Sequence, residues 1–187
     1  FGFLKFYKSV RSKGIKPIAG AEINHVRDSS SHNEHANLTL IAKNQLGYKN
    51  LIKLISKSQI VGKTSGIPVI ETEWLAEHSD GLIALSGGFR GHIGKAVLDT
   101  NHDLFLKRIK YFQKIFKEDF ILEISRINRP QEDLYNDYIL SKAGELGLPV
   151  VASNEVRFID KEDYEAHETR VCIQKGEVLS DSRRTRS

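Results

Sequence analysis

The chain has 187 residues, and its 28 Lys and Arg against 24 Asp and Glu give a formal net charge of +4. With 40% hydrophobic and 28% charged residues, the composition excludes a disordered or membrane-like chain. No apolar run approaches the roughly 20 residues that span a bilayer. The single cysteine, Cys172, excludes an internal disulfide, and the first residues do not have the pattern of an export signal. We therefore expect a cytoplasmic domain, away from membranes, with one core of its own.

Both ends of the sequence are unusual. There is no methionine, and the chain opens on an apolar, helix-like run at 1–7 without a capping residue ahead of it. It closes on a basic, serine-containing run at 182–187. We expect the chain to be a piece of a longer protein, so that part of its function lies outside these residues.

Short apolar segments alternate with amphipathic ones along most of the chain. From the N-terminus we expect a strand over 15–23, a polar loop over 28–35, a strand over 38–42, a helix from Gly47, a loop over 62–66, a helix over 71–78 and a strand over 81–85. We then expect helices over 91–98 and 105–116, a strand over 120–124, a helix from Pro130 to Gly147, a strand over 149–152, and a helix from Lys161 to Gly176 that Asp160 caps.

The expected strands are apolar on both faces and are separated by helices, which is typical of parallel strands covered by outer helices. About five such strand-helix units fit this length, which favours an α/β barrel or a doubly wound sheet. A barrel of this kind closes with seven or eight strands. The sequence is two or three strands short, so we expect a truncated barrel.

The first third of the chain is basic. Residues 1–60 contain ten Lys and Arg against three acids, a local charge of +7, and the remainder is −3. Such a stretch could attract phosphate, which makes a nucleic-acid-binding module one hypothesis. No arginine- and aromatic-rich stripe accompanies it, so we favour solvated faces of two helices.

Polar side chains follow several expected strands, where reactive groups gather in parallel α/β folds. They are Glu22, Asn24 and His25; His32, His35 and Asn37; Ser86, Gly87, Gly88 and His92; and Ser153, Asn154, Glu155 and Arg157. Glu22 and Glu155 could supply oxygen ligands to a metal. However, the chain has no His-x-His pair, and Arg157 places a fixed cation two residues after Glu155.

The remaining candidates are weaker. We expect His32 and His35 to be solvated and His167 to be a surface or packing histidine. The Ser86-Gly87-Gly88 run lacks the frames of a nucleophile elbow and of a P-loop. A buried structural role is the better interpretation of Cys172. The residues alone therefore predict no catalytic constellation.

Four stretches together resemble one known family. They are Gly14-Ile15-Lys16-Pro17-Ile18-Ala19-Gly20-Ala21-Glu22, the segment from Leu38 to Leu51, Gly81-Leu82-Ile83-Ala84-Leu85-Ser86-Gly87-Gly88, and Gly147 to Phe158. In order and spacing they resemble the PHP (polymerase and histidinol phosphatase) domain of bacterial DNA polymerase III alpha subunits. The resemblance runs over essentially the whole chain. It implies a truncated, distorted (β/α)7 barrel that forms a single partial PHP domain over 1–187, without its first strands and without the polymerase domains.

Some members of this family hold a metal cluster at the strand ends, and the resemblance carries their ligand positions onto this chain. Glu22 retains a ligand type, whereas Asn37 stands where a histidine is found and Gly88 where a cysteine or histidine is found. Glu155 and Arg157 stand where an Asp-x-His is found. We treat these five positions as vestigial, and expect neither a metal, nor a cofactor, nor a catalytic residue in this segment.

The resemblance implies a fragment of a replicative DNA polymerase, a nucleotidyltransferase whose Mg²⁺ site lies downstream. The segment itself is then a non-catalytic scaffold that docks the proofreading exonuclease subunit beside other replicase subunits, and the full-length protein contacts the DNA. A metal-dependent PHP phosphoesterase or exonuclease is the alternative. Stoichiometric Zn²⁺ or Mn²⁺ together with activity lost on Glu22→Ala would favour it.

Overall fold

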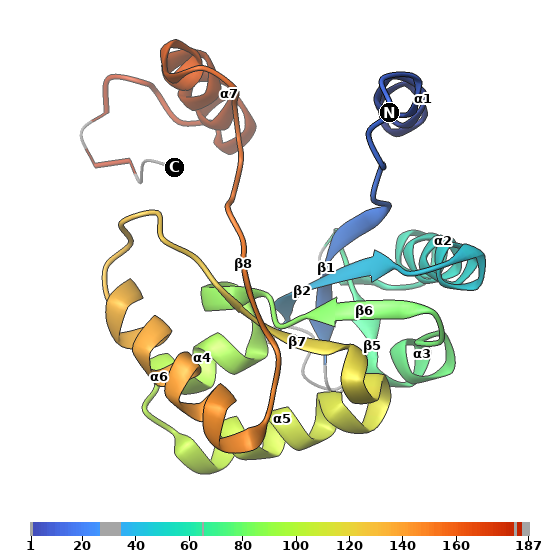
Figure 1. The fold of residues 1–187 in the computed structure, drawn as a ribbon. Coiled ribbons are helices and arrows are strands. Elements are labelled where there is room, and N and C mark those ends of the chain that lie inside the picture. Colours follow the sequence, from blue (N-terminus) through green and yellow to red (C-terminus); the bar gives the residue numbers. More distant parts are fainter. Residues whose placement is uncertain (1, 27–34, 65, 182, 185–187) are drawn as a thin grey trace. The chain divides into compact units, whose positions relative to one another are not determined.

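A mixed sheet with helices packed against one of its faces organises most of the chain (Figure 1). The computed structural model describes residues 2–26, 35–64, 66–181, 183 and 184. The chain divides into a first unit, Phe1–Ser153, and a second unit, Asn154–Ser187. The elements of the first unit are α1 (Phe3–Ser12), β1 (Gly20–Val26), β2 (Ala36–Ala42), α2 (Gln45–Ile60), β3 (Lys63–Thr64), β4 (Ile67–Pro68), β5 (Ile70–Glu71), α3 (Thr72–Glu77), β6 (Leu82–Leu85), η2 (Gly88–Arg90), α4 (His92–Leu98), α5 (His102–Phe116), η3 (Lys117–Asp119), β7 (Phe120–Ile124), α6 (Glu132–Leu146) and β8 (Val150–Ala152).

Side-chain caps explain where several helices begin and end. The Asn44 side chain accepts a hydrogen bond from the Gly47 amide at 2.9 Å, so α2 begins two residues before the predicted start. Asn101 caps α5 in the same way, through the Leu104 amide at 3.0 Å. Gly147 ends α6 with φ of 64°, as predicted.

The strand order is β5-β1-β2-β6-β7-β8, and the pairing corrects the prediction of parallel strands. The pairs β1–β5, β6–β7 and β7–β8 are parallel, but β2 runs antiparallel to both β1 and β6. The connection between β1 and β2, residues 27–35, is too short for the crossover that parallel neighbours need. The α/β class is confirmed, and the sheet is mixed.

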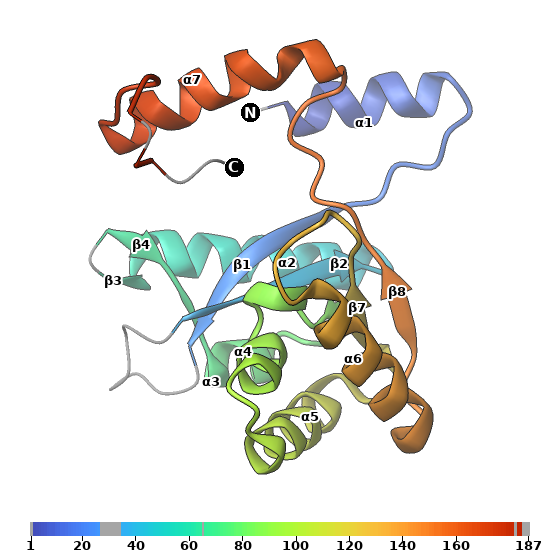
Figure 2. The same ribbon diagram turned by 90° about the vertical axis from the view of Figure 1, so that its left-hand side faces the viewer.

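The two faces of the sheet differ in what they contact. In the six-stranded sheet, the strand side chains of the hydrophobic core all lie on one face, among them Leu38, Leu40 and Leu122. That core also contains side chains from α2 to α6, so these helices cover this face, and Figure 2 shows α4, α5 and α6 together on one side of the sheet. We call the opposite face the open face. Its side chains include Glu22, Asn37 and Glu123.

Within the described residues the sheet is open, with β5 and β8 at its two edges. The closed (β/α)7 barrel therefore stays a prediction. The strand predicted over 15–23 begins only at Gly20, and the loop predicted over 62–66 contains β3, which pairs with β4 in a short hairpin. Most of the loop predicted over 28–35 lies outside the described residues. None of the helices found in the described part combines the length and apolarity that a bilayer crossing requires.

The second unit consists of η4 (Lys161–Asp163) followed by α7 (Tyr164–Lys175). Asp160 and Asp163 form a capping box at the start of this pair, and Gly176 ends α7 with φ of 69°. The predicted helix and its end at Gly176 are confirmed, whereas its first residues, Lys161–Asp163, form a 3-10 turn and the α-helix begins at Tyr164.

Candidate functional site

Two of the five vestigial positions meet on the open face. The antiparallel register pairs Glu22 with Thr39 and Asn24 with Asn37, so Glu22 and Asn37 are diagonal neighbours on β1 and β2. The Asn37 side-chain amide donates a hydrogen bond to Oε1 of Glu22 at 2.9 Å. Because β2 is antiparallel, its amino end lies beside the carboxyl end of β1. The two positions therefore come together for a reason that differs from the predicted parallel arrangement.

The glycine-rich turn after β6 lies beside the same asparagine. Gly91 forms an isolated parallel bridge with Asn37, and a Cβ on Gly87 would stand 2.1 Å from the Asn37 carbonyl oxygen. A Cβ on Gly91 would stand 1.9 Å from the Ser86 carbonyl oxygen. Gly87 and Gly88 both have positive φ, 78° and 52°. Close backbone packing therefore requires glycine at 87 and 91, whereas a Cβ on Gly88 would meet nothing within 4 Å. The third vestigial position, Gly88, brings no side chain to the site.

The last two positions, Glu155 and Arg157, belong to the second unit. Nη2 of Arg157 donates to Oε2 of Glu155 at 3.0 Å, and both side chains are partly exposed. A guanidinium bound to a carboxylate neutralises the charge that would attract a cation.

The chemistry of these five residues is unfavourable for a divalent-metal cluster. The amide N–H of Asn37 occupies one oxygen of Glu22, Gly88 has no donor atom, and Arg157 is a permanent cation. Zinc and manganese sites need imidazole nitrogens and several carboxylate oxygens. In the part of the chain that the structure describes, no group of three or more His, Cys, Asp or Glu is arranged to hold a metal ion.

Two histidines predicted at the strand ends lie in the core instead. His25 is fully buried and His92 is 4% exposed, with ring centroids 5.1 Å apart in an edge-on arrangement. Nε2 of His92 donates to the carbonyl oxygen of His25 at 3.1 Å, and the Phe112 ring lies 5.6 Å from that of His25. Strand alternation explains the position of His25, because it shares the covered face with Ile23, whereas Glu22 faces the other way.

The other candidates have structural roles. Ser86 is buried, and its hydroxyl accepts a hydrogen bond from the Glu123 amide at 2.9 Å, which ties β6 to β7. In the second unit Cys172 is buried, as predicted, and His167 is buried with its ring 5.6 Å from that of Phe158. His35 is half-buried, and His32 lies outside the described residues.

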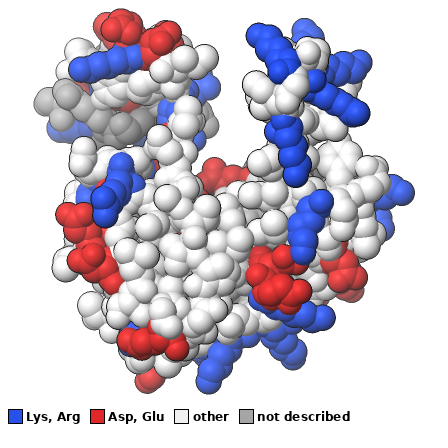
Figure 3. All heavy atoms as spheres, viewed as in Figure 1, with Lys and Arg blue, Asp and Glu red and all other residues white. Residues whose placement is uncertain are grey.

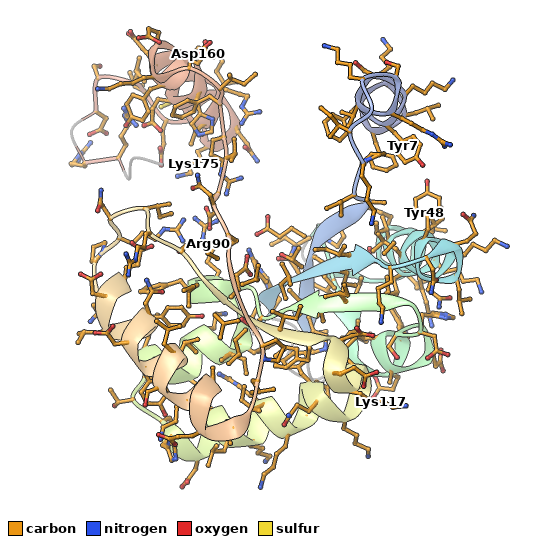
Figure 4. The ribbon with its side chains drawn as sticks, in the orientation of Figure 1. Tyr7, Tyr48, Arg90, Lys117, Asp160 and Lys175 are labelled. Carbon is orange, nitrogen blue, oxygen red and sulfur yellow. The ribbon has the colours of Figure 1, made fainter. Side chains whose placement is uncertain are left out.

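The basic first third consists largely of solvent-facing helix surface. The lysines of α1 are exposed, and Figure 3 shows Lys and Arg over this helix. On α2, Lys57 packs over the Trp74 ring at 4.3 Å from its centroid. The Phe3 ring lies 6.4 Å from that of Tyr48, and Figure 4 labels Tyr48 on α2 and Tyr7 on α1.

The first unit contains a buried carboxylate that was not predicted from the sequence. Glu132, at the start of α6, accepts hydrogen bonds from the Ser125 hydroxyl at 2.9 Å and from the amides of Ile127 and Asn128 at 2.8 and 2.9 Å. Burial raises the pKa of this carboxyl, but the hydrogen bonds from Ser125, Ile127 and Asn128 outweigh it, and the net pKa is lowered. Glu132 thereby anchors the loop at the carboxyl end of β7. An acid in the first turn of a helix just after Pro130 was the available signal.

The comparisons with known proteins agree with the resemblance. The chain is 44% identical over 186 residues to DNA polymerase III subunit alpha of Vibrio cholerae serotype O1, covering 100% of the chain and 16% of the relative. It is 41% identical over 186 residues to the subunit of the same name from Escherichia coli strain K12, with the same two coverages. For that of Haemophilus influenzae the identity is 41% over 183 residues, covering 98% of the chain and 16% of the relative.

The chain therefore spans about one-sixth of the length of these relatives. The family model described as "PHP domain" matches residues 1–127, which is more than half of the chain. On this evidence the chain belongs to the PHP domain family.

Proposed function

We propose that the chain is the PHP portion of a bacterial replicative DNA polymerase III alpha subunit, and that this portion is a non-catalytic scaffold. It docks the proofreading exonuclease subunit. DNA-templated nucleotidyl transfer, with the Mg²⁺ it uses, belongs to other parts of a full-length cytoplasmic protein that contacts the DNA. Identity of 40–44% to proteins named as this subunit, over 98–100% of the chain, supports this assignment.

The observation that supports a scaffold over a phosphoesterase is the hydrogen bond between Asn37 and Glu22. A metal ligand must present a lone pair to the ion, whereas the Asn37 amide presents N–H to the carboxylate. The Arg157–Glu155 ion pair supports the same conclusion, since it pairs the second carboxylate with a cation. We assign these residues a role in holding β1, β2 and the second unit in shape.

The first experiment tests the absence of metal chemistry in the full-length protein. Bound zinc and manganese are measured by mass spectrometry, and hydrolysis of bis(p-nitrophenyl) phosphate is followed with added Mn²⁺. Glu22→Ala is compared with Glu118→Ala, a matched change at an exposed acid of η3. We expect equal background hydrolysis in both variants. Stoichiometric metal, with hydrolysis lost only in Glu22→Ala, would establish the phosphoesterase alternative.

The second experiment tests docking. The full-length subunit and a version without residues 1–187 are each used to capture the purified proofreading exonuclease. We expect capture by the first and loss of capture by the second, while primer extension by the second shows that its polymerase portion is folded. Equal capture by both versions would contradict the proposed role.

A further inference from the structure

A pocket of about 280 Å³ opens on the helical side of the first unit, between the end of α4 and the start of α6. Its walls are mostly apolar and include Val97 and Leu98 from α4 and Leu134, Tyr135 and Tyr138 from α6. Because small-molecule sites are usually about 300 Å³ or larger, this pocket is better suited to one or two side chains of a partner protein than to a cofactor.

The aromatic walls of this pocket are held in place. The Tyr135 hydroxyl donates to the carbonyl oxygen of Glu123 at 2.8 Å, and its side chain is buried. The Tyr138 hydroxyl is hydrogen-bonded to Nδ1 of His102 at 2.7 Å. A partner would therefore meet a preformed surface, which reduces the entropy lost on binding.

One rim residue is strongly apolar and exposed. Leu134 is 72% exposed, although it lines the pocket. On the same helix Leu140 is 45% exposed and does not line the pocket. Exposed apolar side chains around an apolar depression are a feature of protein interaction sites.

The surroundings of Leu134 are acidic. Asp137 lies three residues after Leu134 and four after Asp133, so it neighbours both of them on the surface of α6. Asp99 directly follows the pocket residue Leu98. Within the described part of the chain these exposed carboxylates have no ion pair, while Lys142 near Tyr138 is paired with Glu145 at 2.7 Å.

From the pocket and its charge we propose that this surface binds a basic peptide segment of a partner protein, inserting a leucine-sized side chain beside Leu134 and placing Lys or Arg near Asp99, Asp133 and Asp137. Complementary charge favours a cationic segment over a nucleic acid, whose phosphates the three carboxylates repel. The inference rests on the proposed function only in that a scaffold has partners to bind.

The test uses the full-length protein and a fluorescein-labelled synthetic peptide of lysine and leucine, followed by fluorescence anisotropy. A matched peptide with glutamate in place of lysine is the charge control. Leu134→Glu is compared with Leu140→Glu, which makes the same change at an exposed leucine of α6 outside the pocket. Circular dichroism confirms that both variants fold.

We expect Leu134→Glu to weaken binding of the lysine peptide about tenfold or more, as for a central interface residue, with Leu140→Glu unchanged. Asp133→Asn with Asp137→Asn should weaken binding and flatten its salt dependence. Equal binding of the two peptides, or equal loss in the two leucine variants, would overturn the inference. If the full-length protein captures the exonuclease but does not bind the lysine peptide, this inference is wrong and the proposed function stands. If the lysine peptide binds and Leu134→Glu weakens that binding, but the exonuclease is not captured, only the proposed function is wrong.

Discussion

Removing the buried carboxylate of Glu132 should destabilise the loop that follows β7. Glu132 is 5% exposed, and its two oxygens accept hydrogen bonds from the Ser125 hydroxyl and from the amides of Ile127 and Asn128. In Glu132→Ala all three donors lose their acceptor, whereas Glu132→Gln keeps one acceptor oxygen and loses the charge.

The size of the effect follows from how buried the donors are. A hydrogen bond to a charged group contributes about 1.5–3 kcal/mol, and a buried donor left without a partner costs about 1–3 kcal/mol. Asn128 is exposed and Ile127 is half-buried, so water can replace part of what is lost. We therefore expect Glu132→Ala to lower the free energy of unfolding by about 2–4 kcal/mol, and Glu132→Gln by about half as much.

Urea unfolding measures the free energy, and hydrogen exchange of the 125–128 amides measures the loop itself. Asp137→Ala, an exposed acid on the same helix, is the control and should stay within about 0.5 kcal/mol of the parent. Because the folded-state pKa of Glu132 is lowered from 4.5, its ionised form stabilises the fold above the unfolded-state pKa. The difference in unfolding free energy between the parent protein and Glu132→Gln should shrink as the pH falls through the folded-state pKa of Glu132. Unchanged exchange of these amides in Glu132→Ala would refute the reasoning.

Four further substitutions can be measured by the same unfolding assay. Gly47→Ala should strongly lower the free energy of unfolding, because its Cβ would stand 1.8 Å from the Gly81 carbonyl oxygen. Gly144→Ala should raise the free energy of unfolding by up to about 1 kcal/mol, because its Cβ would meet nothing within 4 Å. Equal effects of the two substitutions would contradict the packing argument. Phe112→Ala should lower the free energy of unfolding by about 3–5 kcal/mol, since this core ring is 1% exposed. A smaller loss would mean that the surrounding side chains collapse into the cavity that the ring leaves. Lys43→Ala should lower the free energy of unfolding by less than about 1 kcal/mol, because the ion pair between Lys43 and Asp119 is partly exposed. A larger loss would contradict the assumption that water screens this pair.

The candidate site could be predicted only in part. Glu22 and Asn37 were identified from the sequence by their places at expected strand ends and by the family resemblance, and the structure joins them by a hydrogen bond. That contact depends on β2 running antiparallel, which apolar composition does not reveal, because strands in both orientations can be apolar. His25 was placed with Glu22 although strand alternation turns it into the core. The pocket beside Leu134 was missed because α4 and α6 meet only in three dimensions. Glu132 was missed although its hydrogen-bond donors lie only four to seven residues away along the chain.

Local chemistry along the chain was enough to locate most helices and strands. Gly147 and Gly176 end helices because only glycine readily adopts positive φ there, and Asn101 and Asp160 begin helical segments because their side chains accept backbone amides. Strand direction, the open face of the sheet, and the partners of buried polar groups were decided by the tertiary structure. The pairing of β2 with β6 and the burial of His25 against His92 and Phe112 arise from contacts between residues far apart in the chain, and no short segment contains the information that sets them.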